Sequence, residues 1–260
     1  MNVLLTNDDG IHAEGIQILA ETLLQNERLK LFIVAPDHER SATGHAITMH
    51  RPLRAEETRF FHNSSLKGWS VNGTPADCVK LAVEYLLPEK PDLVVSGINR
   101  GANLGTDVLY SGTVSAAIEG VILGVPSLAV SLTAREKPDF RFSANFILRM
   151  IGKICNNSHL PQDTLLNINI PGKTRSEIRG VAVTRLGVRV YNNAFQKRVD
   201  PRGNSYYWLA GELLDDLDPE KEADTDVFAI QNSQISITPI QFNLTNFELM
   251  DRLKEIDWGI

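Results

Sequence analysis

Short apolar runs of strand length alternate with helical patterns through the first half of the chain, and this alternation constrains the fold most. Apolar runs lie before Asp8, at Leu31–Ala35, after Pro91 and at Ser127–Leu132. Helical spacing follows at Ile16, Leu19, Ala20, Leu23 and Leu24, from Pro75 to about Leu87, and at Val114, Ala117, Ile118 and Val121. Such alternation predicts an α/β fold with a mostly parallel sheet covered by helices. Ligands of such sheets bind beyond the carboxyl ends of the strands.

The second half of the chain has a mixed pattern. A helix is expected around Ala144–Ile151, with strands at Leu165–Pro171 and Val181–Thr184 and a last strand through Ile235 and Ile240. Short aromatic and β-branched runs between Val188 and Leu209 flank the polar turn Asp200–Asn204, which is typical of a β-hairpin. The segment Asp215–Asp226 is acidic and is expected to be a solvated loop.

Composition excludes several classes of protein. The formal net charge of -6 over 260 residues argues against binding of a nucleic-acid duplex, which needs a basic surface. No apolar run reaches the length of a membrane span, and no secretory signal precedes the first strand. Cys78 and Cys155 lie within helical patterns among apolar residues. They are expected to be buried free thiols of a cytoplasmic protein.

Hard oxygen donors follow three of the predicted strands. Asp8 and Asp9 end the first strand, Ser41 lies beyond the second, and Asn99 follows the strand after Pro91. Adjacent carboxylates repel each other unless a cation lies beside them, and Mg²⁺ and Mn²⁺ prefer oxygen ligands. No thiolate or paired-histidine spacing indicates zinc. These residues predict a Mg²⁺ or Mn²⁺ site, although each segment taken alone also fits an ordinary surface turn.

Two predicted helices begin with polar residues. Ser111, Gly112 and Thr113 would present backbone amides and hydroxyls at a helix N-terminus, which can bind an anion, and simple N-capping is the alternative. Thr74 and Asp77 at the other helix are typical of a cap, so Asp77 is interpreted as structural first. A metal beside an anion site suits phosphoester hydrolysis, because the metal activates water and neutralises phosphoryl oxygens.

The chain resembles the SurE family of stationary-phase survival nucleotidases. The matching stretches are Leu5–Ile11, Ala35–Asp37 with Arg40 and Ser41, Gly73–Cys78, Ser96–Asn99, Asn103–Gly105 and Tyr110–Ala117. Together they span nearly the whole N-terminal half. Departures fall in loops such as His38–Glu39 and Ala42–Ala46, and they affect the expected substrate preference more than the chemistry.

The resemblance implies a metal-dependent phosphatase of nucleoside 5′- and 3′-monophosphates, in some members also an exopolyphosphatase. It implies one divalent cation per subunit, held by Asp8, Asp9, Ser41 and Asn99. It also implies one domain over residues 1–260, with a Rossmann-like metal- and phosphate-binding core at 1–135 and a C-terminal part at 136–260. The hairpin near 188–209 would be exchanged between subunits of a homodimer or homotetramer, although folding back onto its own domain is the alternative.

Our mechanistic hypothesis gives Asp8 and Asp9 the catalytic roles. Asp9 or the metal lowers the proton affinity of an attacking water. The phosphoryl oxygens are expected to contact Asn103, Ser111, Gly112 and Thr113. Basic groups of the hairpin are expected near the phosphate or the base, namely Arg189, Lys197 and Arg198.

Two other classes of protein remain open at this stage. A phospho-accepting signalling domain also carries an acidic pair after its first strand, but here Asn99 stands where an acceptor aspartate is needed. A metal-dependent nucleotide sensor would bind the same ligands without turnover. Release of phosphate from AMP separates an enzyme from both.

Overall fold

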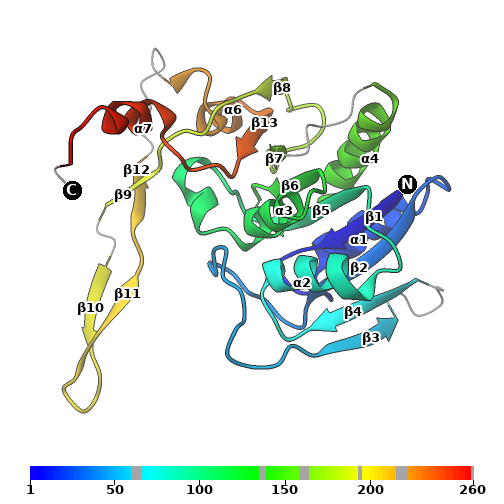
Figure 1. The fold of residues 1–260 in the computed structure, drawn as a ribbon, viewed down its shortest axis with the longest axis horizontal. Helices are drawn as coiled ribbons and strands as arrows, with labels where there is room; N and C mark the ends of the chain where they lie inside the picture. The colour runs from blue at the N-terminus through cyan, green and yellow to red at the C-terminus, as the bar shows by residue number, and fades with distance from the viewer. Residues whose placement is uncertain (60–65, 135–138, 158–163, 193–194, 215–221, 259–260) are drawn as a thin grey trace.

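The computed structural model describes residues 1–59, 66–134, 139–157, 164–192, 195–214 and 222–258 (Figure 1). The strands of the central sheet are β1 Asn2–Thr6, β2 Lys30–Pro36, β3 Ala55–Arg59, β4 Lys67–Val71, β5 Leu93–Arg100, β6 Ser127–Leu132, β7 Thr164–Ile170, β8 Gly180–Val183 and β13 Gln234–Gln241. Four short strands form a separate arm: β9 Val190–Asn192, β10 Phe195–Val199, β11 Ser205–Leu209 and β12 Glu212–Leu214. The helices are α1 Glu14–Leu23, α2 Pro75–Leu81, η1 Ala82–Leu86, η2 Gly105–Leu109, α3 Gly112–Ile122, α4 Phe140–Asn157, α6 Asp226–Gln231 and α7 Phe247–Lys254.

Within the described residues the sheet has nine strands in the order β3-β4-β2-β1-β5-β6-β7-β13-β8. The strands from β4 to β7 pair in parallel, and the antiparallel pairs are β3 with β4 and β7 with β13. The predicted mostly parallel α/β sheet is therefore confirmed. Because β7, β13 and β8 belong to this sheet, the C-terminal part shares its backbone hydrogen bonding with the N-terminal part.

Helices cover both faces of the sheet, so its central strands are apolar on both sides. On one face α1 and α4 pack over Val3 and Leu5 of β1. On the other face α2 and α3 pack over Leu4 of the same strand and Val94 of β5. Figure 1 shows the pair α2 and α3 on the near side of the sheet. This alternation along β1 follows from the two-residue period of a strand.

The N-terminal strand β1 lies where the order in which strands are added to the sheet reverses. From β1 the chain adds β2 on one side, and β5 then returns to pair with β1 on the other side. Open α/β sheets leave a crevice outside the carboxyl ends of their strands at such a point. Asp8 and Asp9 follow the last residue of β1 closely in sequence and lie at this place.

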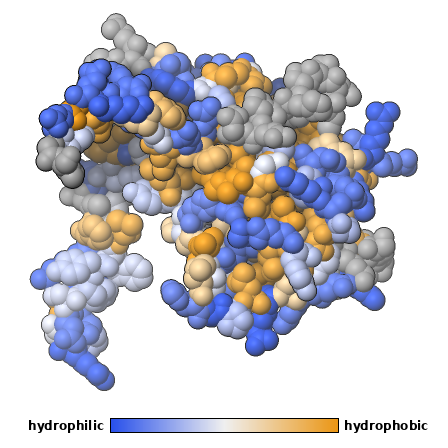
Figure 2. All heavy atoms as spheres, viewed as in Figure 1, coloured by the Kyte–Doolittle hydropathy of each residue, from blue (hydrophilic) through white to orange (hydrophobic). Residues whose placement is uncertain are grey.

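The predicted hairpin is present but longer than expected. Strands β9 and β10 run outward, Asp200–Asn204 forms the turn, and β11 and β12 return. The arm thus covers Val190–Leu214 and projects from the body (Figure 1). Its returning end continues past Leu209 because Glu212–Leu214 pair with Val190–Asn192. Figure 2 shows the tip of the arm as hydrophilic.

Several expected boundaries differ in the structure. The helix from Pro75 changes from α to a wider π turn after Leu81, so only its first part is regular α-helix. Cys78 is a buried free thiol, as expected, whereas the side chain of Cys155 lies outside the described residues.

The expected solvated loop Asp215–Asp226 needs a correction at its end. Residues 215–221 of this segment lie outside the described residues. Asp226, however, is fully buried and begins α6 instead of ending a loop in solvent. Its burial is possible because the carboxylate accepts hydrogen bonds from three backbone amides.

Candidate metal and phosphate site

The turn after β1 fixes the two carboxylates in place. The side-chain amide of Asn7 donates to the carbonyl oxygen of Gly10 at 2.8 Å, which closes the turn. Gly10 has φ +98°, and a Cβ at this position would lie 3.1 Å from the backbone of His38. Glycine is therefore needed both for the backbone conformation and for the approach of the loop after β2.

Asp8 lies against the N-terminus of α3. The hydroxyl of Thr113 donates to Asp8 Oδ1 at 2.5 Å, and the Thr113 backbone also donates a hydrogen bond to this carboxylate. A Cβ on Gly112 would lie 2.7 Å from the Asp8 Cβ, so glycine allows the contact. The helix start that was predicted to bind an anion therefore binds a carboxylate of the chain itself, as expected for the positive end of a helix dipole.

Both carboxylates are harder to ionise than an ordinary aspartate. Burial raises the pKa of Asp8 to about 6, and the neighbouring Asp9 charge adds to this, while the Thr113 hydrogen bond opposes it. Burial also raises the pKa of Asp9, with a further contribution from the Glu39 charge. A cation between these groups would relieve both effects, because it favours the ionised carboxylates.

Asn99 is brought beside the acidic pair by β5. Asp9 Oδ2 accepts a hydrogen bond from the backbone amide of Arg100 at 3.1 Å, which places the end of β5 against Asp9. The side-chain nitrogen of Asn99 donates to the carbonyl of Gly101 at 3.0 Å. Since that nitrogen is used, the amide oxygen of Asn99 is the atom available as a neutral metal ligand.

Ser41 belongs to a loop that contacts Asp8 through its backbone. The amide of Arg40 donates to the Asp8 carbonyl at 2.7 Å, so the loop after β2 lies next to the first carboxylate. The exposed Ser41 hydroxyl itself donates to Glu39 at 2.7 Å. Ser41 is thus adjacent to the acidic pair. Its hydroxyl is hydrogen-bonded to a third carboxylate, that of Glu39, which the sequence did not indicate as part of the site.

Further contacts along this loop hold it to the residue after η2 and to α2. The amide of Gly44 donates to the carbonyl of Tyr110 at 3.1 Å. The Thr48 backbone and hydroxyl both donate to Asp77, at 2.9 and 2.6 Å. Asp77 also forms a reciprocal capping box with Thr74, which confirms the structural interpretation of this residue.

Asn103 is buried within a polar network. Its side-chain nitrogen donates to Ser131 at 2.9 Å and approaches the Thr113 hydroxyl at 3.4 Å. Its backbone pairs with the side chains of Asn167 and Asn169 on β7. The side-chain donors of Asn103 and Thr113 are therefore bonded to other side chains of the protein rather than directed at a ligand. The Ser111 hydroxyl oxygen accepts from the Val114 amide, which leaves the hydroxyl proton of Ser111 for a ligand.

The residues of this network on β6 and β7 were missed in the sequence. A signal exists: Asn167 and Asn169 occupy alternate positions of a strand whose other described residues are mostly apolar. Because alternate residues of a strand share one face, two amides at this spacing indicate a polar row facing one helix layer.

The donor set fits a hard divalent cation. Two carboxylates with raised pKa values, one amide oxygen and one hydroxyl come from three adjoining strand ends. Within the described residues there is no group of three or more His, Cys, Asp and Glu side chains that could hold a metal. Two acids supplemented by neutral oxygens are a donor set that Mg²⁺ and Mn²⁺ sites allow.

The root of the arm contacts the loop that follows the site. Arg189 and the Tyr191 hydroxyl both bind Asp107 of η2, at 2.6 and 2.5 Å. Arg189 was expected to reach phosphate or base, but it is committed to this carboxylate. Lys197 and Arg198 lie exposed on β10, in the projecting part of the arm.

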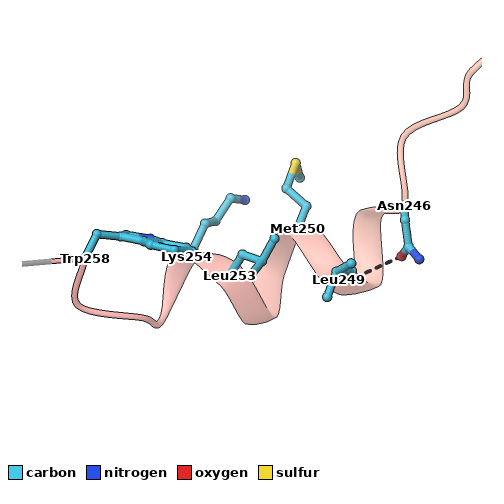
Figure 3. A pocket seen from close by; sticks show the side chains of 6 residues that line it. All are labelled: Asn246, Leu249, Met250, Leu253, Lys254 and Trp258. Atoms are coloured by element: carbon cyan, nitrogen blue, oxygen red, sulfur yellow. Dashed lines mark hydrogen bonds between the residues drawn. The ribbon is translucent and has the colours of Figure 1, made fainter.

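A hollow elsewhere on the surface has a different character. It is lined only by α7 and its flanks, with Leu249, Met250, Leu253 and Trp258 around it (Figure 3). None of these residues is a candidate for metal or phosphate binding.

The described residues contain no helix that is long and apolar enough to cross a membrane.

Comparison with known proteins gives a consistent result. The sequence matches the family model described as survival protein SurE over residues 3–193. A relative from Pelotomaculum thermopropionicum, named 5'-nucleotidase SurE, is 56% identical over 257 residues, covering 98% of this chain and 95% of the relative. One from Carboxydothermus hydrogenoformans with the same name is 54% identical over 256 residues, with the same coverage of 98% and 95%. The crystal structure of SurE from Aquifex aeolicus matches with a TM-score of 0.82 and 41% identity, covering 98% of each chain.

Proposed function

Because this chain belongs to the survival protein SurE family, we propose that it is a divalent-metal-dependent 5′-nucleotidase, which hydrolyses nucleoside monophosphates to a nucleoside and phosphate. One observation carries the proposal. A buried carboxylate with its pKa raised to about 6 lies against a helix N-terminus, with a second carboxylate beside it, at the carboxyl edge of a parallel sheet. Such a site suits a cation and an anionic substrate together.

We assign the metal to Asp8, Asp9, Ser41 and Asn99, with one Mg²⁺ or Mn²⁺ per subunit. The support is the set of contacts that brings Asp9 to β5 and the Ser41 loop to Asp8. When bound, the cation supplies charge neutralisation at the phosphoryl oxygens and lowers the pKa of a coordinated water. Thr113 keeps one oxygen of Asp8 occupied, which orients the carboxylate.

The remaining roles follow from which donors are uncommitted. Asp9 has a raised pKa, which makes it a better acceptor for the proton of the attacking water than an ordinary aspartate. Ser111 and the backbone of Gly112 are proposed to contact the phosphoryl oxygens directly. Asn103 and Thr113 are proposed to support the phosphate-binding set indirectly. The side chain of Asn103 donates to Ser131, and the hydroxyl of Thr113 donates to Asp8.

The assembly is proposed to be a homodimer or homotetramer built through the arm. Its large apolar side chains are exposed, with Trp208 58% and Leu209 74% accessible. Exposed patches of this kind mark interfaces, and exchange of an identical element is a low-cost route to a symmetric dimer. In this arrangement residues 1–135 carry the metal and phosphate groups, and the C-terminal part supports them and makes the interface. The buried free thiol of Cys78 supports a cytoplasmic location.

Release of inorganic phosphate from a panel of nucleotides tests the function. The panel contains AMP, GMP, CMP and UMP, their 3′-isomers and polyphosphate, each with Mn²⁺, with Mg²⁺ and with a chelator. We expect phosphate release from 5′-monophosphates that the chelator abolishes and added metal restores. Metal-dependent binding of AMP without release would instead support a sensor, and a stable phosphoprotein formed from acetyl phosphate would support a signalling domain.

A further inference from the structure

We propose that Asn169, assisted by Asn167, is a positioning residue of this site, which sets the loop Gly101–Gly105 relative to Asp8. This role rests on the proposed function. Neither side chain belongs to the metal- or phosphate-binding sets assigned above. Both lie on β7, which β5 and β6 separate from β1 in the sheet.

Asn169 pairs with both polar groups of one backbone position. Its Oδ1 accepts from the Asn103 amide at 2.9 Å, and its Nδ2 donates to the Asn103 carbonyl at 2.9 Å. Exchanging the oxygen and nitrogen of this amide would place donor against donor and acceptor against acceptor, so the orientation is determined. Asn167 adds a second donor to the same carbonyl at 2.9 Å.

Buried amides are costly unless they are hydrogen-bonded, and one polar atom of this pair is not. Both side chains are fully buried, on a strand between β6 and β13, and they provide the partners of the Asn103 amide and carbonyl. Asn167 Oδ1 has no hydrogen-bond partner in the part of the chain that the structure describes. A buried polar atom without a partner is destabilising, so the pair is not optimised for stability alone, and its three bonds fix the position of the Asn103 backbone.

That position is transmitted to Asp8 through one side chain. With its backbone held, Asn103 directs its amide nitrogen to Ser131 at 2.9 Å and toward the Thr113 hydroxyl at 3.4 Å. The Thr113 hydroxyl in turn donates to Asp8 at 2.5 Å. The longer contact to Thr113 is weak as a hydrogen bond, but it directs an N–H at the Thr113 oxygen and so favours a hydroxyl proton that points toward the carboxylate.

A second anchor, Asp226, holds the loop at its last residue, Gly105. Asp226 is fully buried, and its Oδ2 accepts from the Gly105 amide at 2.8 Å. Its Oδ1 accepts from Gly187 at the root of the arm, at 2.9 Å. With one end of the loop fixed by Asp226, the two asparagines determine where its middle lies. Small misplacements of catalytic groups lower the rate strongly, which is why such a clamp is useful.

The test compares AMP hydrolysis with Mn²⁺ in wild type, Asn169→Leu, Asn167→Leu and the control Ser236→Ala. Ser236 lies opposite Asn169 on β13, is equally buried, and bonds to Thr184 and Thr238 instead of the loop. We expect Asn169→Leu to lower kcat by roughly 100-fold with a smaller change in KM. Asn167→Leu should have a smaller effect, because the Asn103 carbonyl keeps its bond to Asn169. Ser236→Ala should lose stability while kcat stays close to wild type.

A fourth variant covers the case in which Asn169→Leu does not fold. In Asn169→Asp a neutral carboxyl group can both accept from the Asn103 amide and donate to its carbonyl, whereas the ionised form cannot donate. The kcat of this variant relative to wild type should therefore rise as the pH is lowered. A relative kcat that does not change with pH, or a folded Asn169→Leu that matches Ser236→Ala, overturns the positioning role. A wild type that releases no phosphate overturns the proposed function and this role with it.

Discussion

At the scale of single residues, the surroundings of Asp8 determine how the site responds to pH and to metal. The carboxylate is buried, lies beside a second acid and is held by the Thr113 hydroxyl. Two of these influences disfavour the charged form and one favours it. As a result, the ionised Asp8 carboxylate destabilises the metal-free protein, and a bound cation would stabilise it.

Replacing either aspartate of the pair by asparagine should remove activity while the fold survives. Asp9→Asn keeps the shape of the side chain but removes one ligand charge, so metal affinity and AMP hydrolysis should both collapse. Calorimetric titration with Mn²⁺ and a phosphate-release assay measure the two effects. Wild-type turnover by Asp9→Asn at limiting metal would show that the assigned metal site is incorrect.

The stability of the metal-free protein should decrease as the pH rises from about 4 to about 6. The pKa of Asp8 is raised from 3.8 to about 6 in the native state, so in this window the native protein binds more protons than the unfolded chain. Above the window Asp8 is ionised and its hydrogen bonds compensate its burial only in part, at a net cost of about 3 kcal/mol. Thermal melts of metal-free protein across this range measure the effect. In Asp8→Asn this component should vanish, and the melting temperature above pH 6 should hold or rise.

Metal affinity should fall as the pH drops below about 6, because protons and metal compete for Asp8. Thr113→Val should move this fall to higher pH, since the hydrogen bond that favours ionised Asp8 is lost. It should also lower kcat/KM for AMP by about 10-fold at neutral pH, the effect of one lost bond to a charged group. Thr113→Ser retains the hydroxyl and is the matched control. An unchanged pH dependence in Thr113→Val, with lost stability only, would limit this residue to a structural role at the start of the helix.

At the scale of elements, the start of α2 also anchors the loop that carries Ser41. Asp77 accepts from the backbone of Thr74 and from Thr48 twice, and the Thr74 hydroxyl donates to the carbonyl of Ala46. Nearer to Ser41 the loop has separate contacts, from Arg40 to Asp8 and from Gly44 to Tyr110. One end of the loop is therefore held by the turn after β1 and the residue after η2, and the other end by the start of α2.

Asp77→Ala should lower the free energy of unfolding by at least about 1 kcal/mol, the usual cost of a lost cap. Metal affinity should change little, because the contacts of Arg40 and Gly44 remain. Urea unfolding and Mn²⁺ titration measure the two quantities on one protein. Thr48→Val is the control, since it removes only the hydroxyl bond to Asp77. A loss of metal affinity as large as that of Asp9→Asn would assign Asp77 to the site instead.

At the scale of the whole molecule, the arm and the C-terminal helix leave apolar surface without cover in the single chain. Every residue of β10 and β11 is exposed, and α7 has no buried residue. The root of the arm is nevertheless tied to η2, which follows the loop Gly101–Gly105, by Arg189 and Tyr191, which bind Asp107. The proposed interface is therefore connected through η2 to the loop beside the candidate site.

Replacing Val190–Leu214 by a short Gly-Ser linker should give a monomer that still binds metal, because the assigned ligands all precede Arg100. Catalysis should fall more than metal binding, since the Tyr191 bond to Asp107 is lost with the arm. Light scattering measures the mass, and Tyr191→Phe is the control that removes the bond alone. An oligomer of unchanged mass in the linker variant would exclude the arm as the means of assembly.

Much of the fold was predictable because it depends on local pattern. The parallel core strands and the helices α1, α2 and α3 follow from apolar periodicity and capping residues near each other in sequence. The helix α6 was missed because its first residue, Asp226, belongs to an acidic run that is typical of a solvated loop. Its carboxylate is buried only because the amides of Gly105 and Gly187, distant in sequence, converge on it.

For the site, the sequence alone determined which residue types stand at the strand ends: Asp8 and Asp9, Ser41 and Asn99. That information is local, since a strand followed by a turn places the next residues at the edge of a parallel sheet. Only the tertiary structure decided which partners these groups have. The Thr113 hydroxyl meets Asp8 rather than open solvent, and Asn169 holds Asn103, across 105 and 66 residues of sequence. Hydrogen bonds over such separations depend on the order of strands in the sheet, which no local pattern encodes.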